Sequence, residues 1–254
     1  YLLTFTMRRD GSSRFSEDNR WGMFPSAAFA WKIKDEAFLK NVSFISDLKL
    51  RLGWGVTGQQ DISDNFYPYM ALYRSASDGS YYMIDGEYLP TLRPDAYDPN
   101  IKWEETTTQN IGIDFGFINN RINGSFDYYF RETEDLLNRV PIPTGSNFSN
   151  TLYTNIGSLE NKGFEVTLNV VPVLKKDVSL NLGFNFSYND NKITKLLFSD
   201  DPNFIGIIYG DAFTGQKQVT RVGYPAYSYF VNQQVYDADG NPIEGLYVDL
   251  SGEG

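Results

Sequence analysis

The chain has 254 residues, with 22 lysines and arginines against 32 aspartates and glutamates, and it contains neither histidine nor cysteine. Without these two residue types the chain cannot form serine–histidine or cysteine–histidine catalytic sites, disulfides, or zinc sites made of histidine and cysteine. A net charge of −10, with no basic run longer than two residues, argues against nucleic-acid binding.

The dominant pattern along the chain is alternation of apolar and polar residues. Aromatic residues make up 16% of the chain and there are 22 glycines, a composition that favours β-structure. Alternation with a period of two places one apolar and one polar face on each strand. Read in chain order, it predicts eight strands, at residues 1–8, 23–33, 48–56, 111–117, 122–131, 164–170, 178–188 and 227–236.

The connections between these strands fall into two kinds. Residues 119–121 and 173–177 predict tight turns, whereas residues 10–20, 59–102, 139–156 and 196–226 predict long polar loops. Short turns at one end of a sheet and long loops at the other are typical of outer-membrane barrels. The sequence therefore predicts an all-β fold, an antiparallel transmembrane β-barrel segment of about eight consecutive meander strands. A soluble β-sandwich is the alternative.

The barrel interpretation makes two structural predictions. The apolar residues of each strand should face lipid and the polar ones the lumen, and the eight strands should form an open sheet with unpaired edges at 1–8 and 227–236. On the clearest strand, Leu180, Leu182, Phe184 and Phe186 are expected toward lipid, and Asn181, Asn185 and Ser187 toward the lumen.

Specific motifs add a family resemblance. In order along the chain these are RDGSSRF (9–15), NRWGMFPSA (19–27), AWKI (30–33), LKLRLGWGVTGQQ (48–60), KWE (102–104), QNIGIDFG (109–116), NRI (120–122), DYY (127–129), TEDLL (133–137), NIG (155–157) and NKGFE (161–165). The ordered set resembles the barrel of SusC/RagA-like TonB-dependent outer-membrane transporters of Bacteroidota. Asparagine is more usual at the position of Gln59, and the resemblance weakens beyond residue 195.

The resemblance implies a 22-stranded, plugged barrel in the outer membrane, driven by TonB, which imports oligosaccharides or peptides and pairs with a SusD-like surface lipoprotein. Residues 1–254 are then expected to be a partial barrel domain, with the plug, the N-terminal domain and the final strands outside this chain. The alternative, in a different functional class, is a secreted or surface β-sheet module that binds glycans or partners and transports nothing. A glycosidase is a distant third, because nothing selects a pair among the 32 acidic residues, and no enzyme is expected.

The longest loop is the expected place for substrate. Its aromatic side chains can stack on the C–H faces of sugar rings or hold a peptide, although they would equally pack the loop on itself or on a partner protein. The candidate substrate-binding residues are Tyr67, Tyr69, Tyr73, Arg74, Tyr81 and Tyr82.

A weak cofactor signal lies at the last residues of the chain. Asp249, Ser251 and Glu253 match the first half of a calcium-binding loop, and Asp237, Asp239 and Asn241 form a poorer version. Because aspartate, asparagine and glycine are also the ordinary residues of turns, acidic turns without calcium are the preferred interpretation. No other cofactor is expected.

Overall fold

The structure is a computed structural model that describes residues 1–61, 66–75, 81–142, 149, 151–196, 204, 206–210, 218–231 and 233–248. Strands and their connections make up nearly all of the described residues. Their helical content is a single 3-10 turn, η1 (Ile33–Asp35). Within these residues, no helix has the length and apolarity needed to cross a membrane.

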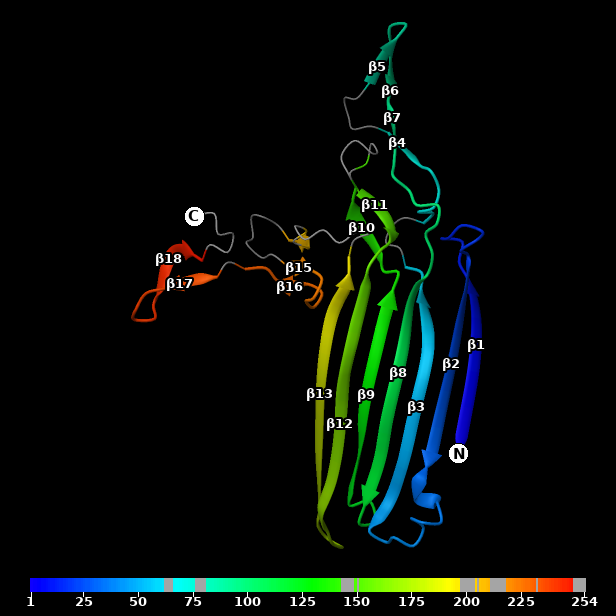
Figure 1. Cartoon of the computed structure of the whole chain (residues 1–254), viewed down its shortest axis with the longest axis vertical. Coiled ribbons are helices and arrows are strands. Elements are labelled where there is room, and N and C mark those ends of the chain that lie inside the picture. The colour runs from blue at the N-terminus through cyan, green and yellow to red at the C-terminus, as the bar shows by residue number, and fades with distance from the viewer. Residues whose placement is uncertain are drawn as a thin grey trace.

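One antiparallel sheet dominates the molecule (Figure 1). Each strand pairs with the strand next to it along the sheet, so the sheet is a meander with local connections. In spatial order the strands are β1 (Leu2–Gly11), β2 (Trp21–Lys32), β3 (Ile45–Gln59), β8 (Glu104–Phe117), β9 (Ile122–Glu134), β12 (Ser158–Leu174) and β13 (Ser179–Lys195).

The register keeps the alternation in phase across the whole sheet. One row, running from β3 to β13, is Leu52, Ile111, Tyr128, Phe164 and Tyr188. The adjacent row, on the opposite face, is Arg51, Gly112, Asp127, Glu165 and Ser187. We call these two surfaces the apolar face and the polar face of the sheet.

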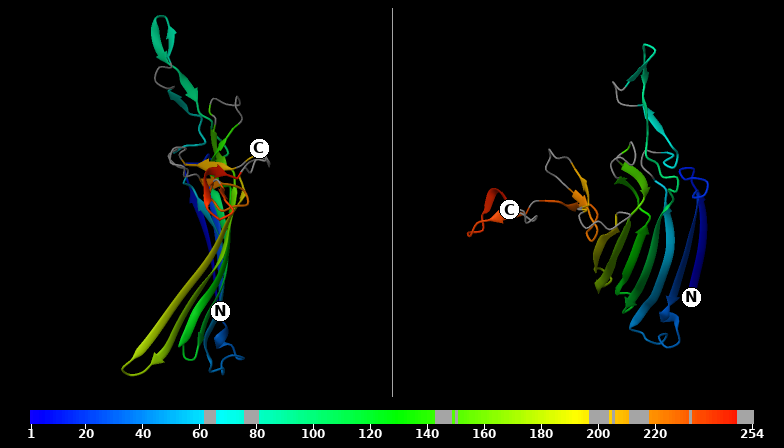
Figure 2. Two further views of the ribbon diagram at one scale, coloured as in Figure 1. Left: turned by 90° about the vertical axis from the view of Figure 1, so that its left-hand side faces the viewer. Right: turned by 45° about the horizontal axis from the view of Figure 1, so that its top comes forward.

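The apolar face is not covered by a second sheet. Leu182 and Phe184 are 55% and 58% exposed, and Figure 2 shows the main sheet edge-on as a single twisted layer. In a sandwich these two side chains would lie in a closed core between sheets. The sandwich interpretation is therefore wrong for this chain, and the predicted antiparallel wall is confirmed.

The segregation of short and long connections is also confirmed. At one end of the sheet, β8 and β9 are joined by a tight turn in which Ile118, Asn119 and Asn120 all have positive φ. The turn between β12 and β13 is closed by a hydrogen bond from the Lys175 amide to the Val178 carbonyl, 2.8 Å long. The predicted long connections lie at the other end (Figure 1), which we call the loop end. The exception to the segregation is the β2–β3 connection, residues 33–44 with η1, which lies at the turn end.

Small two- and three-stranded ladders occupy the loop end. They pair β4 (Tyr73–Ser75) with β7 (Leu92–Pro94), β5 (Tyr81–Ile84) with β6 (Glu87–Pro90), β10 (Leu137–Pro141) with β11 (Thr151–Asn155), β15 (Gln218–Thr220) with both β14 (Ile207–Tyr209) and β16 (Ser228–Tyr229), and β17 (Gln234–Tyr236) with β18 (Pro242–Tyr247). Residues 73–75 and 81–94 form an arm that extends away from the sheet (Figure 1).

The predicted eighth strand of the wall is wrong. Residues 227–236 divide into β16 and β17, which belong to separate small ladders. Tyr227 has a φ of 57°, which interrupts an extended segment, and the Gln234 side-chain amide donates to the carbonyls of Ile243 and Leu246 at 2.7 and 3.1 Å. Local hydrogen bonds therefore hold β17 against β18. The described wall has seven strands, and its edges are β1 and β13 with no ladder between them.

The main cluster of buried side chains lies at the loop end. Phe15 and Ile101 are fully buried, and Trp103 packs on Phe15 and Phe24 with ring centroids 5.2 and 5.4 Å apart. These four residues form the collar cluster, against which Val56, Tyr69, Leu137 and Tyr153 also pack. The sheet itself has one layer, so burial occurs where the connections fold over its end.

Candidate functional site

A charged network crosses the polar face at the middle of the sheet. Arg51 on β3 binds Asp114 on β8 at 2.8 Å and Asp127 on β9 at 2.9 Å. Lys49 joins the same Asp114 carboxylate at 2.7 Å. Reaching β9 from β3 requires the guanidinium to pass over Gly112, where an added Cβ would lie 2.7 Å from Arg51 Nη2. The glycine thus leaves room for an arginine to join three strands.

A second link over a glycine lies nearer the loop end. Tyr129 on β9 donates its hydroxyl to Asn189 Oδ1 on β13, at 2.9 Å, across the intervening strand β12. At Gly163 on β12 an added Cβ would lie 2.6 Å from that hydroxyl. Together, the two links fix the polar face as a rigid surface that carries charges and amides at set positions.

The connections at the loop end are tied to one another. The Asn155 side chain accepts from the Lys102 amide at 2.8 Å and donates to the carbonyls of Lys102 and Asp135 at 2.9 and 2.8 Å. Thr154 donates to Asp98 at 2.6 Å. With the collar cluster, these bonds join the end of the longest connection to the β10–β11 hairpin, which makes a fixed rim at this end of the wall.

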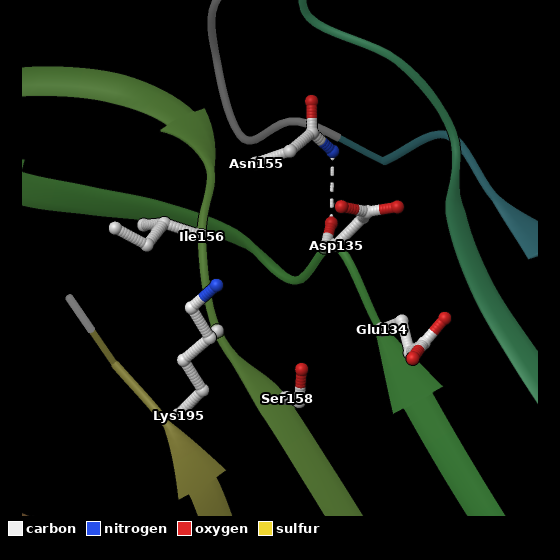
Figure 3. A pocket seen from close by; sticks show the side chains of 7 residues that line it. Glu134, Asp135, Asn155, Ile156, Ser158 and Lys195 are labelled. Atoms are coloured by element: carbon white, nitrogen blue, oxygen red, sulfur yellow. Dashed lines mark hydrogen bonds between the residues drawn. The ribbon is translucent and has the colours of Figure 1, made fainter. Parts of the chain in front are cut away.

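A small cavity of about 190 Å³ marks the joint below that hairpin (Figure 3). Here the β9–β12 ladder ends and the chain bends, with φ of 56° at Asp135 and 123° at Gly157. Figure 3 shows the Asn155 amide bonded to the Asp135 carbonyl, with Lys195 on the other side of the cavity. The joint orients the hairpin. Within the described ranges, no group of three potential metal ligands is found, at this cavity or elsewhere.

The structure distributes the predicted tyrosines along the longest connection. Tyr67 lies between the end of β3 and the arm, and Tyr69 packs against the collar cluster. Tyr73 is on β4, while Tyr81 and Tyr82 are on β5, and these three are 67%, 52% and 70% exposed. In the arm, the ring centroids of Tyr81 and Tyr88 are 6.5 Å apart, and the rings meet edge to face.

Arg74 pairs through its backbone with Arg93, which places it in the ladder that forms the base of the arm. Its side chain is outside the described part of the molecule. The candidate ligand-binding residues of the loop are therefore spread between the rim and the tip of the arm.

The predicted calcium ligands have two outcomes. Asp249, Ser251 and Glu253 lie outside the described residues, so that hypothesis stays a prediction. The poorer version is a turn: the Asp237 carboxylate accepts from the amides of Asp239 and Asn241 at 2.9 and 2.8 Å. Hydrogen bonds from Asn241 and its neighbours lower the pKa of Asp237 below its usual value. Its oxygens thus stabilise the β17–β18 turn.

The polar face holds a further recess that the sequence analysis did not identify. It is a cavity of about 440 Å³ near the loop end, formed by β1, β2, β3 and β8. The available signal was the phase of the alternation, because Thr6, Ser26, Thr57 and Thr108 all fall on the polar side of their strands.

A known protein family and several of its members match this chain over most or all of its length. The family described as "TonB dependent receptor-like, beta-barrel" matches residues 1–252. The TonB-dependent receptor SusC of Bacteroides thetaiotaomicron is 52% identical over 258 residues, covering 100% of this chain and 26% of that protein. The TonB-dependent receptor P39 of Formosa agariphila is 41% identical over 200 residues, covering 79% of this chain and 18% of that protein.

Solved structures show the same architecture. The RagAB peptide importer in its open-open state superposes with a TM-score of 0.76 at 28% identity, covering 98% of this chain and 27% of the matched chain. The structure of the RagAB peptide transporter gives 0.73 at 30% identity, covering 95% and 26%. The chain thus spans about a quarter of the length of SusC and of the RagAB chains it matches.

Proposed function

The chain belongs to the TonB dependent receptor-like β-barrel family, of the SusC/RagA type in the outer membrane, and on that basis we propose that the protein containing it imports oligosaccharides or peptides across that membrane. The observation that carries the proposal is the one-layer, seven-stranded meander. Almost the whole of this chain superposes on part of the barrel wall of an importer. The proposed energy source is TonB, acting through a part of the protein outside this chain.

In this proposal the apolar face contacts lipid and the polar face lines the lumen. The phase of the charges supports this orientation, because Arg51, Asp114 and Asp127 all lie on the polar face. A lysine or arginine on the lipid face would cost about 2–4 kcal/mol near the middle of the bilayer. Trp54, on the apolar face toward the loop end of β3, would then lie nearer the membrane interface than the charged network.

The loop end is then the external mouth of the transporter. We propose a SusD-like surface lipoprotein as the partner over this mouth, with Tyr73, Tyr81 and Tyr82 of the arm contacting either that partner or the substrate. These three side chains are more than half exposed. An isolated two-stranded ladder such as β5–β6 is only marginally stable in water, so a partner or substrate that covered these side chains would stabilise it. Tyr67, Tyr69 and Arg74, closer to the rim, are the other proposed substrate contacts.

No catalytic role is proposed for this chain. Its relatives have the names of receptors and transporters, and a histidine-dependent site cannot form here. Calcium at Asp249, Ser251 and Glu253 is a secondary proposal that applies to the longer protein, where the remaining ligands of such a loop would follow.

The test is uptake by cells of the source organism. Deleting the gene should abolish accumulation of at least one labelled oligosaccharide or peptide from a panel, and an uncoupler of the inner-membrane proton gradient should have the same effect on the wild type. Restoring the full-length gene is the control. If the protein is found in the medium, or if uptake is unaffected by both treatments, the binding-module alternative replaces transport.

A further inference from the structure

The recess on the polar face is formed around one row of aligned residues. Thr6 on β1 pairs with Ser26 on β2, Ser26 with Gly55 on β3, and Gly55 with Thr108 on β8. We call these four residues the hydroxyl row. Neighbouring strands lie about 4.8 Å apart, so three hydroxyl side chains project from one face along a line about three strand spacings long.

Gly55 keeps the row open in the middle. An added Cβ at this position would lie 3.0 Å from the Ser26 Cβ, so a side chain there would fill the space between the serine and Thr108. The hydroxyls of Thr6, Ser26 and Thr108 make no side-chain hydrogen bond to any described part of the chain. They are available to an external ligand, and each can both donate and accept.

The charged pair beside Thr6 is balanced, and at the other end of the row Arg131 on β9 pairs with Thr108. Arg8 Nε lies 2.7 and 2.6 Å from the two carboxylate oxygens of Asp10, on the same face of β1 as Thr6. The Arg8–Asp10 pair offers charged donors and acceptors without a net charge of its own, which suits hydrogen bonding to a neutral polar ligand. A ligand with a net charge would gain little attraction from it.

The recess is bounded toward the loop end by an aromatic side chain. Phe24 is only 7% exposed because it packs on Trp103 in the collar cluster, yet it also lines the recess. Between the hydroxyls, threonine methyl groups and bare glycine backbone add apolar surface. The lining therefore alternates polar and apolar patches at short range.

This alternation fits a sugar better than a peptide. A sugar ring has hydroxyls at its edge and C–H groups on its faces, whereas an extended peptide that adds to a sheet pairs with a free strand edge. Along the hydroxyl row, β2 and β3 are paired on both sides. The ladder between them ends at Ser26 and Gly55, and beyond it the Phe24 ring lies against Gly58 of β3. A peptide backbone would have to displace that ring to pair with either strand.

We propose that the hydroxyl row, together with Arg8 and Asp10, is a binding subsite for a neutral oligosaccharide on the lumenal wall below the mouth. This inference rests on the proposed import function and specifies the substrate class. It assigns ligand contacts to the wall, in addition to those proposed for the loop tyrosines.

The binding test uses the full-length protein and a triple variant, Thr6→Val, Ser26→Ala and Thr108→Val. The matched control is Thr107→Val, since Thr107 is next to Thr108 but pairs with Val56 in the apolar phase. The probes are glucan hexasaccharides with α-1,4, β-1,3 and β-1,4 linkages, and a neutral hexapeptide. Each hydroxyl that contacts the sugar should raise Kd about two- to tenfold when removed, with Thr107→Val unchanged.

A second variant keeps the proposal testable if the triple variant does not fold. Ser26→Cys in the full-length protein should react with a membrane-impermeant maleimide more than the wild type does, and the attached group should then block hexasaccharide binding. If Ser26→Cys is not labelled, another part of the protein covers the recess and the proposal is overturned.

The remaining outcomes separate this inference from the function beneath it. Equal hexasaccharide Kd values for the wild type and the triple variant would overturn the subsite while leaving import intact. Uptake of the peptide without any hexasaccharide would overturn the ligand class alone. If cells import neither kind of probe, the proposed function fails and the subsite fails with it.

Discussion

At the scale of single residues, glycines determine which side chains can meet across the wall. Gly112 and Gly163 lie under side chains that span a whole strand, whereas an added Cβ at Gly183 would meet only Asn169 Oδ1, at 3.4 Å. All three are strand glycines, yet the alternation alone does not distinguish them. What separates them is the side chain on the adjacent strand, because Arg51 and Tyr129 reach across their paired glycines to the strand beyond. A single sequence does not reveal this pairing.

Gly112→Ala should destabilise the full-length barrel, because the new Cβ displaces Arg51 from Asp127. Loss of charge-assisted hydrogen bonds of this kind is expected to cost about 1–3 kcal/mol. The measurement is the denaturant midpoint of the folded band on a semi-native gel. Gly183→Ala, which makes only an ordinary contact, is the matched control and should change stability by less than about 0.5 kcal/mol. Equal midpoints for both variants would show that the arginine link does not stabilise the wall.

At the scale of elements, the sequence predicted the strands of the wall but not the use of their ends. Seven of the eight predicted strands are present, and β12 and β13 extend at their loop ends to Ser158 and Lys195, beyond the predicted 164–170 and 178–188. Those extensions carry Glu160, Lys162 and Lys192, whose charges obscure the alternation. The Tyr227–Tyr236 segment was wrongly predicted as a wall strand because its apolar spacing is that of a strand. The positive φ of Tyr227 and the hydrogen bonds of the Gln234 side chain to β18 keep it in small separate ladders.

The β10–β11 hairpin should loosen when its anchor is removed. Asn155→Asp replaces a donor to two carbonyls, at 2.9 and 2.8 Å, by an acceptor that repels them. We expect faster cleavage of residues 137–155 by added protease, in intact cells or in detergent. Asn138→Ala is the control, since that side chain bonds only to the amide of Arg139 next to it. Unchanged cleavage of Asn155→Asp would contradict the anchoring role.

The arm is expected to contribute to binding but not to the stability of the wall. Replacing β5–β6 (Tyr81–Pro90) by a short glycine–serine linker should change the free energy of unfolding by less than about 0.5 kcal/mol, because the ladder packs on no part of the collar cluster. It should weaken co-purification of the surface lipoprotein or binding of substrate. Normal partner and substrate binding after this deletion would remove the arm tyrosines from the proposed site.

At the scale of the whole molecule, the main fact is a wall with two unpaired edges. The outer edges of β1 and β13 pair with no other strand of the described sheet, although Ile193 on β13 bonds to Gly223 and Tyr224. An unsatisfied backbone group in hydrocarbon costs several kcal/mol. In water, such edges pair with other chains. The isolated 254-residue chain is therefore expected to aggregate or to need detergent, and to give no transport in liposomes. A soluble monomer by light scattering would contradict this expectation.

The consecutive pairing of the strands also bears on how the wall forms. Each strand of the main sheet pairs with the next main-sheet strand along the chain. Between β3 and β8, and between β9 and β12, the chain first forms small ladders at the loop end. Contacts close in sequence need little loop-closure entropy, so hairpins can add to the growing edge one after another. Pairing β3 with β8 is expected to be the slowest step of such a sequence, because some 44 residues lie between Gln59 and Glu104. Shortening that connection should therefore speed assembly without altering the register of the barrel.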